Sequence, residues 1–234
     1  MEIPPVENLA ESPTVPLRPI LIDQSMLEAP RSVERRRDFE DGMSYLQPLT
    51  IGTIILLCVI FGLQLSHHAL ATEESIVAAG ALKRSNILAG EVWRLLSAVF
   101  LHGSLDHIIG NCLVLYVLGM AVEHAYGRLQ LLIVFLLSGV TGSLLSFSLS
   151  EGPSVGASGA IFGLIGCLIG FFYRFREKVY FREKRLGGVL LFLVAHSVIT
   201  GFLTPFIDNW AHIGGLLGGL GTTLFLKPVE KVLI

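Results

Sequence analysis

Long apolar runs are the feature that most limits what this chain can fold into. Stretches of about 17 or more mainly apolar residues recur along it, and this is the length of a helix that crosses a bilayer. Only 15% of the 234 residues are charged, whereas about 25% is usual in soluble domains. We therefore expect an all-α, polytopic membrane protein that has the lipid bilayer as its solvent. A net charge of −2 excludes a bulk positive field, so no nucleic-acid partner is expected.

Six membrane spans are predicted after a polar N-terminal stretch. They lie at roughly 49–69, 101–122, 129–150, 157–173, 187–204 and 209–226. Residues 1–48 are predicted to be a largely disordered cytoplasmic tail, 49–226 a six-helix membrane domain, and 227–234 a short cytoplasmic tail. The loop between the first two spans is amphipathic. It is expected to carry short interfacial helices, with Trp93 and Arg94 at the level of the lipid headgroups.

The distribution of Lys and Arg predicts the orientation of the spans. With the N-terminus in the cytoplasm, only Lys83, Arg84 and Arg94 of the 17 Lys and Arg lie on the outer side. The positive-inside rule therefore favours cytoplasmic N- and C-termini. The second, fourth and sixth spans then all begin at the outer side. We expect a bacterial plasma membrane as the location.

Three polar side chains lie near the outer end of the second span, in FLHGSLDHIIGN. They are His102, His107 and Asn111, of which the last two are i,i+4 neighbours on one helix face. Interhelical hydrogen bonds explain such residues without any further function. A polar group within a span is also, by default, a candidate for a functional site.

Ser158 and His212 lie near the outer ends of the fourth and sixth spans. Each is followed by a stripe of small residues that lets another helix approach closely. The stripes are Gly159, Gly163, Gly166 and Gly170 in the fourth span, and Gly215 and Gly219 in the sixth. Ser158 is one more packing residue in one interpretation. In the other, the stripes pack together and bring the hydroxyl and the imidazole within hydrogen-bond reach, as a Ser–His nucleophile requires.

Other polar residues are given simpler interpretations. Asp208 lies four residues before His212 and could complete a triad, although capping the sixth span is the commoner role for Asp in such a position. The cysteines lie within apolar runs and are interpreted as small buried hydrophobes: Cys58, Cys112 and Cys167. Paired metal-ligand spacings such as HExxH are not found, so neither a metal nor a cofactor is expected.

At these residues the chain resembles the rhomboid family of intramembrane serine proteases. The matching motifs are Trp93-Arg94, HGSLDHIIGN, GASGAIFG around Ser158, and AHIGGLLGG around His212. The last motif fits the family pattern AHxxGxxxG, which places Gly215 and Gly219. The resemblance covers roughly residues 49–226 and is similar to the six-span form of the family.

The resemblance implies a Ser158–His212 dyad that needs no acidic third member. It implies that the Ser158 N–H, His107 and Asn111 stabilise the oxyanion. The supporting roles also follow from the resemblance. His102 matches a position that helps to hold the loop structure and water near the site. Trp93-Arg94 matches a structural element of the first loop.

Two further positions are placed by the same resemblance. Glu123 matches a structural acid at the inner end of the second span. Phe162 occupies a position that is often Tyr and is expected to stack on the His212 ring.

The function implied is hydrolysis of peptide bonds in or beside transmembrane segments of other membrane proteins. Two alternatives stay open. A proteolytically inactive rhomboid-like binding protein usually lacks the Ser or the His, and both are present here. A small transporter or channel should show internal repeats or charged residues lining a path at mid-membrane, and neither is clear in the sequence. The fifth span and the loop 203–208 are expected to gate lateral entry of substrate.

Overall fold

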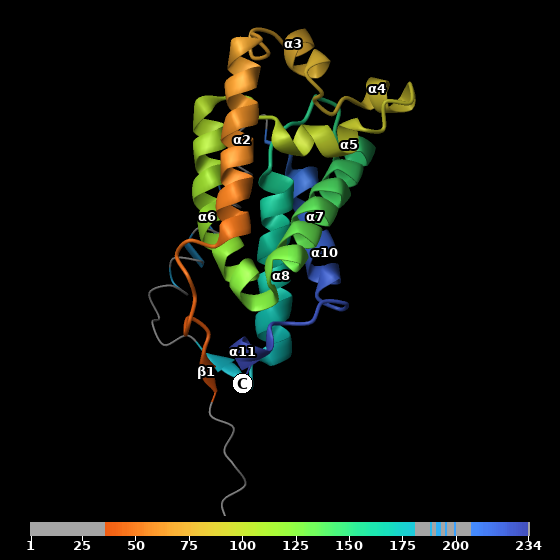
Figure 1. The fold of residues 1–234 in the computed structure, drawn as a ribbon. Coiled ribbons are helices and arrows are strands. Elements are labelled where there is room, and N and C mark those ends of the chain that lie inside the picture. Colours follow the sequence, from red (N-terminus) through yellow and green to blue (C-terminus); the bar gives the residue numbers. More distant parts are fainter. Residues whose placement is uncertain are drawn as a thin grey trace, which may run out of the picture. The chain divides into compact units, whose positions relative to one another are not determined.

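Helices and one pair of very short strands form the part of the chain that the structure describes. The computed structural model describes residues 36–180, 188, 191, 192, 195, 199 and 207–233. The strands β1 (Arg37–Asp38) and β2 (Val179–Tyr180) pair in parallel. The helices of this unit, shown in Figure 1, are α2 (Pro48–Ser66), α3 (Glu73–Ala78), α4 (Arg84–Leu88), α5 (Arg94–Ser97), the 3-10 helix η1 (Ala98–Phe100), α6 (Leu105–Tyr126), α7 (Arg128–Leu149), α8 (Ser158–Phe175), α10 (Asn209–Thr222) and α11 (Glu230–Leu233).

The helical bundle has two ends with different elements. The pocket end carries α3, α4 and α5 and the first residues of α6, α8 and α10, and the strand end carries β1, β2 and α11 (Figure 1). The prediction of short helices between the first two spans is confirmed, since α3, α4, α5 and η1 all lie there.

Four helices of the described residues are long and apolar enough to cross a membrane: α2, α6, α7 and α8. The second span was expected over 101–122, but α6 begins only at Leu105. It begins there because the Ser104 hydroxyl accepts a hydrogen bond from the His107 N–H and caps the helix. The predicted fifth span, 187–204, lies almost wholly outside the described residues.

The sixth predicted span is shorter than expected. It was placed at 209–226, but α10 ends at Thr222 and has 14 residues, about 21 Å of helix. The Thr222 and Thr223 hydroxyls donate to the carbonyls of Gly219 and Leu220, and turns follow in place of further helix. The described residues therefore establish a helical membrane bundle, but they do not establish six full-length spans.

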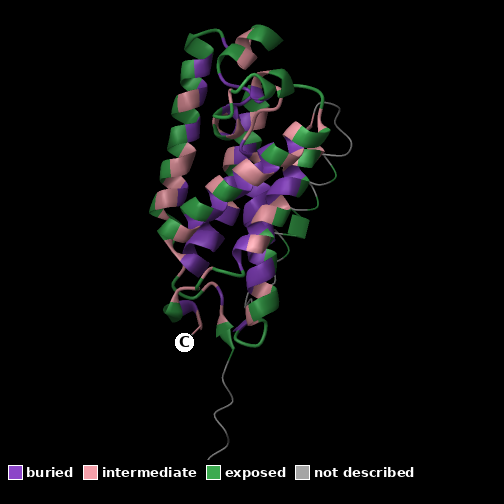
Figure 2. Cartoon of the chain, turned by 90° about the vertical axis from the view of Figure 1, so that its right-hand side faces the viewer, coloured by how far each residue is buried: buried purple, intermediate pink, exposed green. Residues whose placement is uncertain are grey.

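The helix at the centre of the bundle is α8. In its most apolar 18-residue window 67% of the residues are buried, against 22% for α2, which lies at the periphery. In Figure 2 the purple, buried positions gather along the inner helices, and α2 shows mostly exposed and intermediate positions. The neighbours of α8 are α6, α7 and α10. The long exposed side chains of α2 face outward, where a bilayer would solvate them.

The packed unit extends beyond the predicted membrane domain at the strand end. Residues 36–47 were assigned to a disordered tail, yet β1 lies here and the Phe39 ring is fully buried. That ring makes edge contacts with His124, Phe171 and Phe172. His124 is buried as well. An apolar ring in a polar segment is stabilised by burial, which explains the ordered strand.

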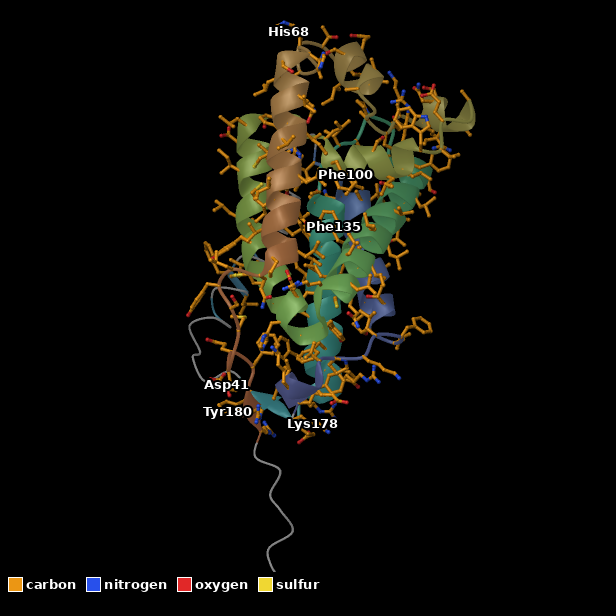
Figure 3. The ribbon with its side chains drawn as sticks, in the orientation of Figure 1. Asp41, His68, Phe100, Phe135, Lys178 and Tyr180 are labelled. Atoms are coloured by element: carbon orange, nitrogen blue, oxygen red, sulfur yellow. The ribbon has the colours of Figure 1, made fainter. Side chains whose placement is uncertain are left out.

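The C-terminal residues also pack at the strand end. The Val229 N–H donates to the Ala125 carbonyl at 2.8 Å, and Val232 is buried. The tail predicted at 227–234 thus includes the short helix α11. Figure 3 labels Lys178 and Tyr180 at this end, far from His68 at the end of α2, while Phe100 and Phe135 lie together near the pocket end.

Glu123 joins α2 to α6 near the strand end. Its buried carboxylate accepts hydrogen bonds from the Leu49 N–H (3.1 Å), the Thr50 N–H (2.8 Å) and the Thr50 hydroxyl (2.8 Å). These N–H groups belong to the first turn of α2, where no backbone acceptor is available, and Pro48 at the helix start has no N–H. A side chain of α6 therefore caps α2.

Candidate functional site

Ser158 and His212 meet at the pocket end of the bundle. The His212 Nε2 lies 2.9 Å from the Ser158 Oγ, within hydrogen-bond distance. Ser158 is the first residue of α8, so its side chain stands beside N–H groups that lack a partner within the helix. His212 lies in the first turn of α10 and is buried. With the ring hydrogen on Nδ1, Nε2 accepts the hydroxyl hydrogen.

Small residues bring α8 and α10 into backbone contact. A Cβ at Gly215 would overlap the Gly159 carbonyl, and a Cβ at Gly219 would overlap the Gly163 carbonyl. Both stripes predicted from the sequence therefore face each other. This close approach places two short side chains from different helices within reach of one another.

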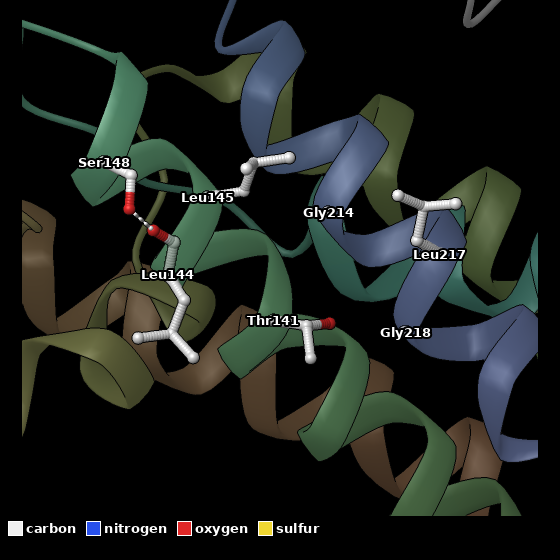
Figure 4. Close-up of a pocket in the computed structure, with 7 residues that line it drawn as sticks. All are labelled: Thr141, Leu144, Leu145, Ser148, Gly214, Leu217 and Gly218. Atoms are coloured by element: carbon white, nitrogen blue, oxygen red, sulfur yellow. Dashed lines mark hydrogen bonds between the residues drawn. The ribbon is translucent and has the colours of Figure 1, made fainter.

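A neighbouring face of α10 packs on α7 in a similar way. A Cβ at Gly214 would lie 2.6 Å from the Thr141 carbonyl oxygen, too close for a real side chain. Gly214, Gly218 and Thr141 line a groove of about 500 Å³ between the two helices, shown in Figure 4 with the leucines that form its walls. Helix α10 is thus fixed on two sides by contacts that leave no room for a side chain.

Phe162 fixes the plane of the His212 ring. The two rings are stacked, with centroids 4.2 Å apart and an interplanar angle of 5°. Phe162 lies one turn after Ser158 on α8, so one helix supplies both the hydroxyl and the surface on which the imidazole rests. The stack restricts rotation of the imidazole beside the hydroxyl.

Asp208 holds the start of α10 against the end of α7. Its carboxylate accepts a hydrogen bond from the Ala211 N–H and so caps α10. It also accepts from the hydroxyls of Ser146 and Ser150, the latter at 2.8 Å. Among the described residues, the donors to this carboxylate do not include the His212 ring. Asp208 therefore has the geometry of a cap and not of a third member of a triad.

His107 and Asn111 lie together on the same pocket. A Cβ at Gly156 would be 2.7 Å from the His107 Nε2 and 3.6 Å from the Asn111 Nδ2. Gly156 has φ +129°, a conformation that side chains rarely adopt. The Asn111 side-chain nitrogen is buried and has no hydrogen-bond acceptor within the part of the chain that the structure describes. An unpaired buried donor is costly, and it is satisfied if an acceptor enters the pocket.

His102 lies behind the pocket and is fully buried. Its backbone exchanges two hydrogen bonds of 3.0 Å with the Gln64 side chain, which ties the loop to α2. Its ring packs edge-on against His107, with centroids 5.1 Å apart. Burial, together with the neighbouring His107, lowers the pKa of His102 to about 4, so the ring is neutral at pH 7.

One cavity of about 620 Å³ joins these groups. Ser158, His212, His107 and Asn111 all line it. They come from the first halves of α6, α8 and α10, three elements that are far apart in the sequence. In residues 36–180 and 207–233, clusters of three His, Cys, Asp or Glu that could hold a metal ion are not found.

Arg94 lies away from this cavity, inside the loop between α2 and α6. Its side chain is buried and donates to the carbonyls of Val77 and Ala81 and to Glu91, and its depth at the headgroup level stays a prediction. The hydrogen bond from Arg94 lowers the pKa of Glu91. Trp93 is half exposed. The centroid of its ring lies 4.6 Å from the guanidinium carbon of Arg94. Arg94 therefore organises the loop that borders the site.

A comparison with known families identifies the fold. The family model described as the rhomboid domain matches residues 89–228, more than half of the chain. The chain belongs to the rhomboid family. The matched part contains all four residues that meet at the cavity and the helices that carry them.

Individual members of the rhomboid family are also similar over most of the chain. Rhomboid protease GluP of Bacillus subtilis is 39% identical over 181 residues, which cover 77% of this chain and 34% of that protein. RHOMBOID-like protein 5 of Arabidopsis thaliana is 38% identical over 154 residues, 64% of this chain and 49% of that protein. This rhomboid chain thus spans about a third to a half of the length of these curated relatives.

Two residues of this rhomboid site were not predicted from the sequence. Gly156 was not singled out, although it has a positive φ and the closest approach to His107. Gln64 was also overlooked, because a Gln at the end of an apolar run gives no sign of the loop that it holds. A glycine two residues before Ser158 was the available signal for the first of them.

Proposed function

We propose that this chain is an intramembrane serine endopeptidase that cleaves peptide bonds in or beside transmembrane segments of other membrane proteins. The observation that carries the proposal is the 2.9 Å contact between Ser158 and His212 at the start of two helices in a rhomboid domain. A hydroxyl beside an imidazole is a weak nucleophile made reactive by a neighbouring base.

In the proposed reaction, the His212 Nε2 takes the hydroxyl proton as the Ser158 Oγ attacks the carbonyl carbon of the substrate. The tetrahedral intermediate collapses when the amide C–N bond breaks and His212 gives its proton to the leaving amine. Water then attacks the acyl-enzyme ester with His212 again as base, and the Ser158 hydroxyl is restored.

The developing oxyanion needs hydrogen-bond donors in the cavity. The unpaired Asn111 Nδ2, the His107 ring and the free N–H groups at the start of α8 are suited to this role, because they line the same space as Ser158. Phe162 would keep the imidazole in its productive orientation. We assign no cofactor to the reaction, because the Ser–His pair supplies both nucleophile and base.

We further propose that the cavity opens to the outer side of the membrane and that both termini are cytoplasmic. The support is the distribution of Lys and Arg: among the described residues the pocket end holds only Lys83, Arg84 and Arg94, and the strand end holds the rest. A bacterial plasma membrane fits this arrangement. GluP is a bacterial protein named a rhomboid protease, while a relative in Arabidopsis thaliana is named as mitochondrial.

The test uses the purified full-length chain in liposomes with a single-span reporter protein. Wild-type protein is expected to cut the reporter, and Ser158→Ala and His212→Ala are expected to abolish the cut while keeping the thermal unfolding midpoint. Unchanged cleavage by Ser158→Ala contradicts the dyad. Binding of the reporter with no cleavage by the wild type would favour a rhomboid-like binding protein.

A further inference from the structure

The cavity beside Ser158 carries negative charge without a positive partner. Two carboxylates, those of Asp106 and Asp208, line it, while Lys and Arg are absent from its lining among the described residues. Burial lowers the pKa of the nearby His102, so that ring adds no positive charge at pH 7. A substrate segment that enters the cavity therefore meets a negative potential.

The two carboxylates differ in what they do within the fold. Asp208 is used by the structure, because Ser146, Ser150 and the Ala211 N–H all donate to it. These neutral donors leave its charge uncancelled. Asp106 is exposed in the first turn of α6 and has neither an ion pair nor a side-chain hydrogen bond within residues 36–180 and 207–233. A favourable interaction with the helix dipole accounts for an acid in a first turn, but it leaves the carboxylate free for a ligand.

The nearby cations are all occupied elsewhere. Lys83 pairs with Glu73 at 3.0 Å and Arg94 with Glu91 at 2.6 Å. The third cation of the pocket end, Arg84, donates to the Ser148 carbonyl and lies 5.8 Å from the Phe147 ring. None of these three lines the cavity formed by the described residues. Among the described residues, the charge of Asp106 is therefore not neutralised.

The position of Asp106 relates this charge to the reacting groups. It directly precedes His107 and lies in the same helix as Asn111, which are the side chains proposed to bind the oxyanion. Gly110, one helical turn further along, also lines the cavity and leaves room beside the carboxylate. A long side chain of a substrate has space to reach Asp106 while its neighbouring backbone lies at Ser158.

From these observations we infer that Asp106 is a specificity residue that selects substrates with a Lys or Arg within a few residues of the cleaved bond. The inference rests on the proposed function and adds the class of side chain that the site favours. A Lys or Arg stem suits such a site, because it packs along apolar walls while its charged end meets the carboxylate. A Glu at the same substrate position would be repelled.

The test measures the ratio of kcat/KM for Lys- and Glu-containing substrates, because a ratio cancels changes in overall activity. Full-length protein in liposomes is given a single-span reporter with Lys, Gln or Glu at each position from about five residues before to about five after the cut. We expect at least one position where wild type prefers Lys over Glu by about five- to tenfold at low salt. Asp106→Asn should bring that ratio closer to one, with Asp208 then the remaining carboxylate of the described lining, and Asp106→Lys should invert it.

The control is Glu151→Lys, which changes an exposed charge at the same end of the bundle but outside the cavity lining. It should leave the ratio unchanged. If Asp106→Lys fails to fold, the ratio for Asp106→Asn decides. A ratio that is equal in wild type and the Asp106 variants, or that shifts equally with Glu151→Lys, overturns the inference and leaves the proposed function standing. Failure of wild type to cut even the Gln reporters overturns both.

Discussion

Two helix pairs in this bundle are held together in different ways. Helices α8 and α10 touch through their backbones, with Gly215 and Gly219 seated on the carbonyls of α8. Helices α2 and α6 are joined near their end by the Glu123 carboxylate, which binds the first turn of α2. The backbone contact leaves no room for a single added methyl group, whereas the polar cap acts on one end of a helix. The Ser158–His212 pair lies on the first kind of interface.

The largest effect is expected when a methyl group is added at the α8–α10 contact. Gly219→Ala places a Cβ on the Gly163 carbonyl, so the helices must separate. We expect a loss of about 2–3 kcal/mol in the free energy of unfolding and a fall in reporter cleavage of more than about a hundredfold. Thermal unfolding in detergent and cleavage in liposomes measure the two effects. The matched control is Gly62→Ala on α2, where a Cβ meets open space among the described residues. Equal effects of the two variants would refute the comparison.

A smaller effect, on stability alone, is expected at the α2–α6 contact. Glu123→Ala leaves the first N–H groups of α2 without their acceptor and should lower the free energy of unfolding by about 2 kcal/mol. The value of kcat well below the unfolding midpoint should stay within about threefold of wild type. Glu123→Gln keeps one acceptor oxygen and should lose about half as much stability. A large drop in kcat with unchanged stability would mean that this contact also positions the dyad.

Substitution of Phe162 tests how the His212 ring is positioned between α8 and α10. Phe162→Ala removes a stack worth about 1 kcal/mol and should lower kcat about fivefold through misorientation of the imidazole. Phe162→Tyr keeps the stack and should retain activity within about twofold. Steady-state cleavage of one reporter by both variants gives the comparison. If Tyr and Ala reduce kcat equally, ring stacking is not what matters at this position.

The smallest effect is a pH dependence that comes from the loop on the α2 side. The pKa of His102 is lowered to about 4 in the folded protein and is about 6.5 when unfolded. As pH falls below 6.5 the unfolded chain binds the proton first, so this contribution to stability is present above pH 6.5 and is lost progressively towards pH 4. We expect a loss of about 0.7 kcal/mol between pH 7 and pH 6. His102→Gln should reduce the change of the unfolding midpoint with pH over this range. An equal pH dependence of the midpoint in both proteins would contradict the assignment.

The sequence predicted the helices that carry the site better than it predicted their ends. Glycine stripes beside Ser158 and His212 indicated a close helix pair, because small residues have little other use at such spacing in a span. The start of α6 was misplaced by four residues, since the capping role of Ser104 depends on where the chain leaves the loop. The end of α10 was misplaced because apolar residues continue past Thr222 although the helix does not.

The contacts at the strand end were beyond what sequence patterns reveal. Phe39 lies in a polar segment, and no nearby residue in the sequence indicates that its ring packs against Phe171. Strands β1 and β2 are only two residues long each. Their pairing joins residues that are more than a hundred positions apart in the sequence. Periodicity cannot detect elements so short, because a repeat needs several turns or strand steps to be seen.

Gly156 has a consequence for recognising which related chains are active. Any side chain at this position would adopt a strained backbone and would collide with the His107 ring. A homologous chain can thus keep its serine and its histidine and still lose the cavity by a single change outside both. Sorting such chains into proteases and pseudoproteases by the dyad alone would misclassify them, and the glycine two residues before the serine should be checked as well.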